Sequence, residues 1–187
     1  MVHSGFTNFT PACGRIKTRS RKLWIMTIWP LQSECAARFG NPSTASWQRQ
    51  NLIQIPVPWK LAMGNIPIRA IPINKIAAPS LAKVLADIWQ QCGKSQKAIA
   101  HIGMDQFSGS FAVRKMRGGN EVSMHSYGLA IDWDAPKNPQ HAPDAKTEFH
   151  SHSTMVKAFK AEGWIVGVDW SGNSRDAMHV QAARVKP

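Results

Sequence analysis

Apolar side chains recur at helical spacing in one stretch of the chain and alternate with small or polar ones in another. Residues Ser80 to Gly93 follow Pro79 and carry the clearest helical pattern. Its apolar positions are Leu81, Val84, Leu85, Ile88 and Trp89. From Gly128 to Trp133 the residues alternate instead, which predicts a strand with Asp132 on its polar face.

Shorter patterns predict the other elements. Two proline-rich segments, Leu52–Trp59 and Ile66–Ile73, favour edge strands or loops, because proline cannot donate to a central ladder. We expect further helices at Ser33–Phe39, Ser95–His101 and Thr154–Glu162, and strands at Phe107–Arg114, Trp164–Val168 and near His179–Gln181. This order predicts an α+β fold: a small, mostly antiparallel sheet with helices packed on one face.

The length of 187 residues suits one domain with a substantial core. We expect a basic, disordered extension at residues 1–25 and a single domain at residues 26–187. Hydrophobic residues make up 43% of the chain, and no apolar run is long enough to cross a bilayer. Cys13, Cys35 and Cys92 lack metal-type spacing, and Cys35 and Cys92 fall in apolar helical patterns typical of core residues.

A formal net charge of +12 indicates attraction to polyanions. Nucleic acid is one candidate, but the sequence shows no nucleic-acid-binding signature and no basic stripe interleaved with aromatics. The anionic bacterial envelope is another. A basic surface that serves only solubility is the third interpretation.

Two short segments carry the residues best suited to chemistry. The first contains His125 and Asp132, with Gly128 between them to let the chain bend. The second contains Asp176 and His179. Two imidazoles and one carboxylate make a three-ligand zinc site with an open fourth position, which leaves Asp176 as general base. Residue chemistry alone leaves open the alternative that these are hydrogen-bonded structural residues.

A resemblance strengthens the metal hypothesis. Ser123-x-His125-x-x-Gly128-x-Ala130-x-Asp132, followed by Glu162-Gly163-Trp164 and Asp176-x-x-His179, resembles zinc D-alanyl-D-alanine carboxypeptidases and phage L-alanyl-D-glutamate endolysins. The likeness extends over roughly residues 29–185 and implies the hedgehog/D-Ala-D-Ala peptidase fold. It implies His125, Asp132 and His179 as zinc ligands and Asp176 as the base. Many relatives carry Glu where this chain has Asp176.

Four further residues are candidates for substrate contact. Arg114 would follow a strand that leads to the metal segment, and its guanidinium could hold a stem-peptide carboxylate. Arg117, beside two glycines, is a second candidate, although it also fits a solvated turn. Ser123 and Tyr127 could donate hydrogen bonds to the ligands or to substrate.

The resemblance therefore implies a zinc-dependent peptidase that hydrolyses peptidoglycan stem peptides, with L-alanyl-D-glutamate endopeptidase as the leading activity. D-alanyl-D-alanine carboxypeptidase is the alternative, and a non-catalytic metal- or wall-binding domain is a third. We expect a monomer that binds neither nucleic acid nor membrane. The apolar run Leu23–Leu31 is interrupted by Thr27 and Pro30, so we expect no signal peptide. Synthesis would be cytoplasmic, with action on the wall after release or export.

Overall fold

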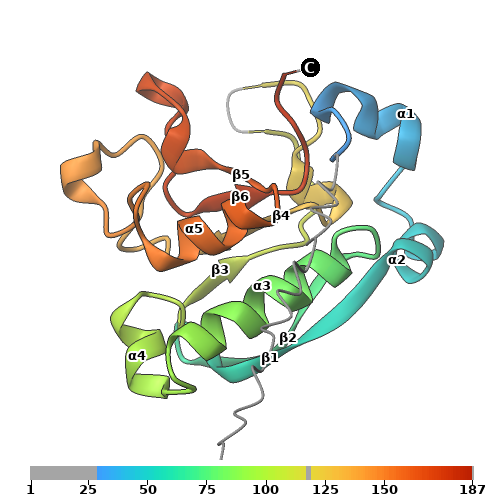
Figure 1. Ribbon diagram of the computed structural model, residues 1–187. Helices are drawn as coiled ribbons and strands as arrows, with labels where there is room; N and C mark the ends of the chain where they lie inside the picture. Colours follow the sequence, from blue (N-terminus) through green and yellow to red (C-terminus); the bar gives the residue numbers. More distant parts are fainter. Residues whose placement is uncertain (1–28, 117–118, 187) are drawn as a thin grey trace, which may run out of the picture.

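Two antiparallel sheets organise the computed structural model, which describes residues 29–116 and 119–186. A four-stranded sheet has the order β3-β4-β6-β5, and a two-stranded sheet pairs β1 with β2 (Figure 1). The strands are β1 (Leu52–Met63), β2 (Ile66–Asn74), β3 (Phe107–Gly109), β4 (Ala130–Trp133), β5 (Ile165–Val166) and β6 (His179–Gln181). The expected α+β class with antiparallel strands is confirmed.

The register of β4 and β6 sets the geometry of the candidate site. Asp132 is paired with His179, and Ala130 is paired with Gln181. Paired residues of neighbouring strands point to the same face, with Cβ atoms about 5 Å apart. The carboxylate and one imidazole, 47 positions apart in sequence, are therefore neighbours across two strands.

The proline-rich segments form the long hairpin β1–β2, with a register shift between Pro56 and Leu61. Because a two-stranded sheet consists of edges only, its prolines cost few ladder hydrogen bonds. This agrees with the prediction for these segments. The backbone of Asn74, at the end of β2, donates to the Gly128 carbonyl (2.7 Å) and so joins the hairpin to the loop before β4.

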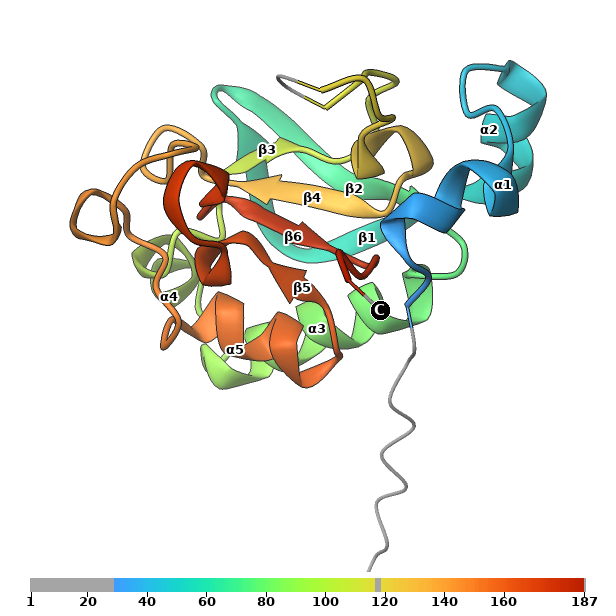
Figure 2. The same cartoon turned by 90° about the horizontal axis from the view of Figure 1, so that it is seen from above.

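Helices α3 (Ala78–Gln91) and α5 (Thr154–Ala161) contact each other and lie side by side in both views of the ribbon (Figures 1 and 2). The apolar face predicted for α3 is buried, including Leu81 and Ile88. The helix begins two residues earlier than expected and has Pro79 in its first turn. Proline is tolerated there because the first N–H groups of a helix have no intrahelical acceptor.

Within residues 29–116 and 119–186, the remaining α-helices are α1 (Cys35–Phe39), α2 (Ala45–Asn51) and α4 (Gln96–His101). Single turns of 3-10 helix in the described part of the chain are η1 (Gln32–Glu34), η2 (Met124–Tyr127), η3 (Asp144–Lys146), η4 (Gly167–Asp169) and η5 (Gly172–Ser174). The sequence did not predict α2, and two predicted strands are shorter than expected. β3 ends at Gly109 rather than Arg114, and β5 ends at Val166 because η4 follows it.

The first described residues, 29–32, form an N-terminal strap along the C-terminal segment. Arg184 donates through its backbone to Pro30 (2.8 Å) and accepts from the backbone of Gln32 (2.8 Å). The strap therefore lies against the chain just beyond β6. The extension predicted at residues 1–25 and the candidate Arg117 lie outside the described residues. None of the helices that the structure describes is long and apolar enough to span a membrane.

Candidate metal centre

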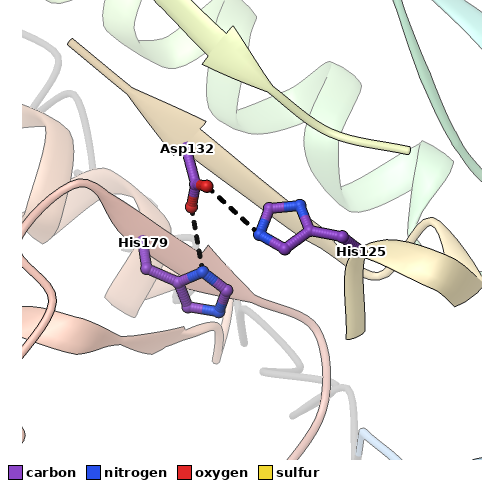
Figure 3. A group of neighbouring side chains, drawn as sticks. All are labelled: His125, Asp132 and His179. Atoms are coloured by element: carbon purple, nitrogen blue, oxygen red, sulfur yellow. Dashed lines mark hydrogen bonds and ion pairs between the residues drawn. The ribbon is translucent and has the colours of Figure 1, made fainter. Parts of the chain in front are cut away.

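Three side chains meet on one face of the four-stranded sheet (Figure 3). Asp132 comes from β4, His179 from the start of β6 and His125 from the turn η2. One ligand atom from each lies within 4.8 Å of the others. The carboxylate lies between the rings, 3.3 Å from His125 Nε2 and 2.9 Å from His179 Nδ1.

Local structure explains how His125 reaches the sheet. The Ser123 hydroxyl accepts the backbone N–H of His125 (3.4 Å), which caps the turn. Gly128 ends the turn with φ +62°, and a Cβ at that residue would lie 2.6 Å from Leu52 Cδ2. The same Cβ would lie 3.0 Å from the Asn74 backbone nitrogen, so the left-handed, crowded position favours glycine. The predicted bend between His125 and β4 is thus present.

Hydrogen bonds fix which nitrogen of each ring faces the centre. His125 Nδ1 lies 2.7 Å from the Ser110 carbonyl, which can only accept, so Nδ1 carries the proton and Nε2 faces Asp132. His179 Nε2 lies 3.0 Å from Gln181 Oε1, so the Nδ1 of this ring faces Asp132. Each ring thus presents one nitrogen to the same point.

This arrangement fits a divalent cation. Each imidazole lies between two oxygen acceptors, but a neutral ring has only one N–H to donate. The buried Nε2 of His125 lies 3.3 Å from Asp132 Oδ2 but makes no well-formed hydrogen bond with any of the described residues. Ligand atoms around a tetrahedral zinc ion are about 3.3 Å apart, close to the two observed separations. A cation bound by both free nitrogens and the carboxylate would satisfy all three groups.

The charge state of Asp132 also suits a cation ligand. Burial acts to raise its pKa, but the interactions of the carboxylate with the neighbouring His125 and His179 rings outweigh burial and hold the pKa well below its usual value. The pKa of His179 is raised: burial lowers it, and the Asp132 carboxylate more than compensates. The pair therefore keeps a carboxylate anion at the centre.

Asp176 lies beside the centre and is held through its backbone. Its N–H donates to the Gly167 carbonyl (3.0 Å), and its carbonyl accepts from the His179 N–H (3.1 Å). The side chain is buried, with 7% of the residue exposed, and its charge contributes to the raised pKa of His179. The residue predicted as general base is therefore next to a predicted ligand; its catalytic role remains a prediction.

A cleft of about 500 Å³ opens above these groups. The four residues of the predicted centre line it, as do Arg114, Ser123 and Trp170. The Trp170 ring lies 5.3 Å from the His179 ring. Arg114 is exposed at the cleft, and its backbone N–H donates to the Ser126 hydroxyl (2.9 Å). Arg114 and Ser123 thus both line the cleft, Ser123 as a buried residue, and their contact with substrate stays a prediction.

Other predicted residues lie elsewhere. Tyr127 does not line the cleft: it is 2% exposed and packs against Phe39 and Trp47 in the core, because η2 turns its side chain away from the site. Trp164, which belongs to the motif that carries the family resemblance, is also buried and donates to the Ser80 hydroxyl (2.9 Å).

Sequence reasoning missed the contribution of two glutamines. Gln181 and Gln32 both line the cleft, and the Gln181 side chain contacts His179. For Gln181 the available signal was its position two residues after His179 on one strand face. Gln32 lies in the segment 29–185 over which the family likeness extends, but no local signal predicted its contact with Gln181, 149 positions away.

Comparison with known protein families gives a match to part of the chain. Residues 117–182, about a third of the chain, match the family model described as D-alanyl-D-alanine carboxypeptidase. The matched segment contains His125, Asp132, Asp176 and His179. No curated protein and no solved structure gives a significant match. The family match supports a metallopeptidase that acts on peptidoglycan, within the broad zinc peptidase group.

Proposed function

We propose that this protein is a zinc peptidase that cleaves peptidoglycan stem peptides, with hydrolysis of the L-alanyl-D-glutamate bond as the leading activity. The alternative is D-alanyl-D-alanine carboxypeptidase activity. One observation carries the proposal: two imidazole nitrogens of fixed orientation and a carboxylate converge in a cleft, within the segment that matches the carboxypeptidase family.

His125 through Nε2, His179 through Nδ1 and Asp132 through its carboxylate would hold the ion. When bound, zinc supplies Lewis-acid polarisation of the scissile carbonyl and lowers the pKa of water. The remaining chemistry belongs to the chain. Asp176 accepts a proton from the attacking water and returns it to the leaving amine. Its backbone hydrogen bonds to Gly167 and His179 keep it oriented for this transfer.

Arg114 would anchor the substrate. Stem peptides carry carboxylates, and a guanidinium can bind one through two parallel hydrogen bonds. The exposed Arg114 side chain lines the cleft, so a peptide lying over the centre could reach it. The endopeptidase substrate offers the carboxylates of D-glutamate, and the carboxypeptidase substrate offers a terminal carboxylate. Arg114 suits both.

Digestion of purified peptidoglycan separates the two activities. The protein is incubated with wall fragments with zinc, and in parallel after chelation, and the products are identified by mass spectrometry. New peptide ends between L-alanine and D-glutamate support the leading activity, whereas release of free D-alanine supports the alternative. Unchanged fragments in the presence of stoichiometric zinc would contradict both.

The variant Asp176→Ala tests the division of roles. It removes the proposed base but none of the proposed ligands, so zinc should stay bound while turnover falls at least about 10²-fold. Zinc content by metal analysis and rate by product release are measured on the same preparation. Loss of zinc together with activity would show that Asp176 is a ligand instead. Full activity of the Asp176→Ala variant would show that Asp176 is not the general base.

A further inference from the structure

We propose that Gln181, itself oriented by Gln32 of the N-terminal strap, is a positioning residue that holds His179 as a metal ligand through Nδ1. This inference rests on the proposed zinc site and names two residues that support it. Gln32 lies outside the segment that matches the carboxypeptidase family.

The contacts of Gln181 leave one orientation for its amide. Its Nε2 lies 2.8 Å from the Ala183 carbonyl, which can only accept a hydrogen bond. The NH₂ group must therefore face Ala183, and Oε1 must face His179 Nε2 at 3.0 Å. Gln181 is 2% exposed, so water does not compete for these contacts.

Gln32 strengthens the same orientation. The Gln181 NH₂ group also donates to Gln32 Oε1 (3.3 Å), while Gln32 Nε2 lies 3.3 Å from Met116 Sδ. The strap that carries Gln32 is held by backbone hydrogen bonds between residues 30–32 and Arg184. The start of the described chain thus supports a ligand near its end.

The hydrogen bond has three effects on His179. It keeps the proton on Nε2, which leaves the Nδ1 lone pair directed at the centre, and it prevents a flip of the ring. An acceptor on the remote nitrogen also makes the ligating nitrogen more basic, and loss of such a partner commonly weakens metal binding by about 10–100-fold. Ala130, opposite Gln181 on β4, leaves the amide space between the strands.

Gln181 could instead serve only to satisfy the buried Ala183 carbonyl, and two variants separate these roles. Gln181→Met keeps an apolar side chain of similar size but lacks both amide groups. Gln181→Glu keeps an acceptor for His179 Nε2. As a matched control, Gln96→Met removes an amide that bonds the Lys60 backbone on both sides (2.8 and 3.0 Å), away from the cleft.

Zinc dissociation constants are measured by competition with a chromogenic chelator, and thermal midpoints are measured on the metal-free proteins. We expect Gln181→Met to weaken zinc binding about 10–100-fold, Gln181→Glu to recover most of this loss and Gln96→Met to bind zinc as the wild type does. Gln32→Met should weaken binding less, and should add little to Gln181→Met because it acts through Gln181.

A spectroscopic signature accompanies the affinity. In the zinc-bound wild type, the Nε2 proton of His179 should exchange slowly with water and be visible by NMR, and in Gln181→Met it should be lost to fast exchange. Wild-type zinc affinity in Gln181→Met would overturn this inference alone. Absence of zinc binding by the wild type would overturn the proposed function and the inference with it. If Gln181→Met fails to fold, the other two variants decide. Wild-type zinc affinity in Gln32→Met, together with weak zinc binding by Gln181→Glu, would then overturn the positioning role of Gln181.

Discussion

Asp176 is fixed by an unusually close approach of two backbone segments, and Gly167→Ala would disturb it. A Cβ at residue 167 would lie 2.1 Å from the Asp176 carbonyl oxygen and 3.1 Å from the Asp176 Cβ. Contacts of a Cβ below 3.0 Å essentially never occur, so the segments must separate by about 1 Å. The displaced atoms are backbone and cannot rotate away.

A shift of this size should be costly for catalysis. Misplacement of a catalytic group by about 1 Å can reduce the rate by about 10²-fold. The same overpacking should destabilise the fold by about 1–3 kcal/mol. The displaced carbonyl also accepts the backbone N–H of the proposed ligand His179 (3.1 Å), so zinc content is measured beside turnover to separate loss of the base from loss of a ligand. The assays are turnover of wall fragments, zinc content and the free energy of unfolding in urea.

Gly172→Ala is the control for Gly167→Ala. Gly172 has φ +57°, and no atom lies within 4 Å of a Cβ placed there. The control should therefore lose about 1–2 kcal/mol from left-handed strain without pushing on Asp176. We expect it to retain near wild-type turnover. Full turnover in Gly167→Ala, at a stability equal to that of Gly172→Ala, would refute the argument that this contact orients Asp176.

Three other predictions address the bend, the ligands and the core. Gly128→Ala should destabilise the fold by about 1–3 kcal/mol in urea unfolding, because it combines left-handed strain with a contact of 3.0 Å to the Asn74 backbone nitrogen; an unchanged midpoint would contradict this. Zinc affinity should fall as pH is lowered, since protons compete with zinc for His179, whose pKa is raised. In the metal-free protein, protonated His179 adds to the free energy of unfolding below its unfolded-state pKa. This contribution is lost as pH rises through the folded-state pKa. Burial raises the pKa of the Cys35 thiol to about 11, so Cys35 should resist alkylation at pH 8 in the folded protein and react after unfolding.

The sequence predicted the parts of the site that depend on local patterns. Alternation around Asp132 and the glycine at 128 correctly indicated a strand preceded by a bend, since both signals lie within a few residues. Asp176 and His179 are only three residues apart, so the sequence could also predict that they lie close together. What the pattern could not give is the pairing of β4 with β6, which brings Asp132 opposite His179. There the family resemblance supplied the missing long-range information.

Other features escaped prediction for identifiable reasons. Tyr127 and Trp164 are amphipathic aromatics that suit either a core or a cleft, and only the packing decides between these. The hydrogen bond from Gln181 to Gln32 joins the strap to β6, so no window of sequence contains both. The strand predicted to reach Arg114 ends at Gly109, where the partner strand β4 provides no further pairing.

The most direct test of the central claim is a crystal structure of the zinc-soaked protein with anomalous scattering recorded at the zinc edge. The account predicts one strong peak in the cleft, about 2.0–2.2 Å from His125 Nε2, His179 Nδ1 and an oxygen of Asp132. A zinc ion bound elsewhere, or by the other nitrogen of either ring, would contradict it.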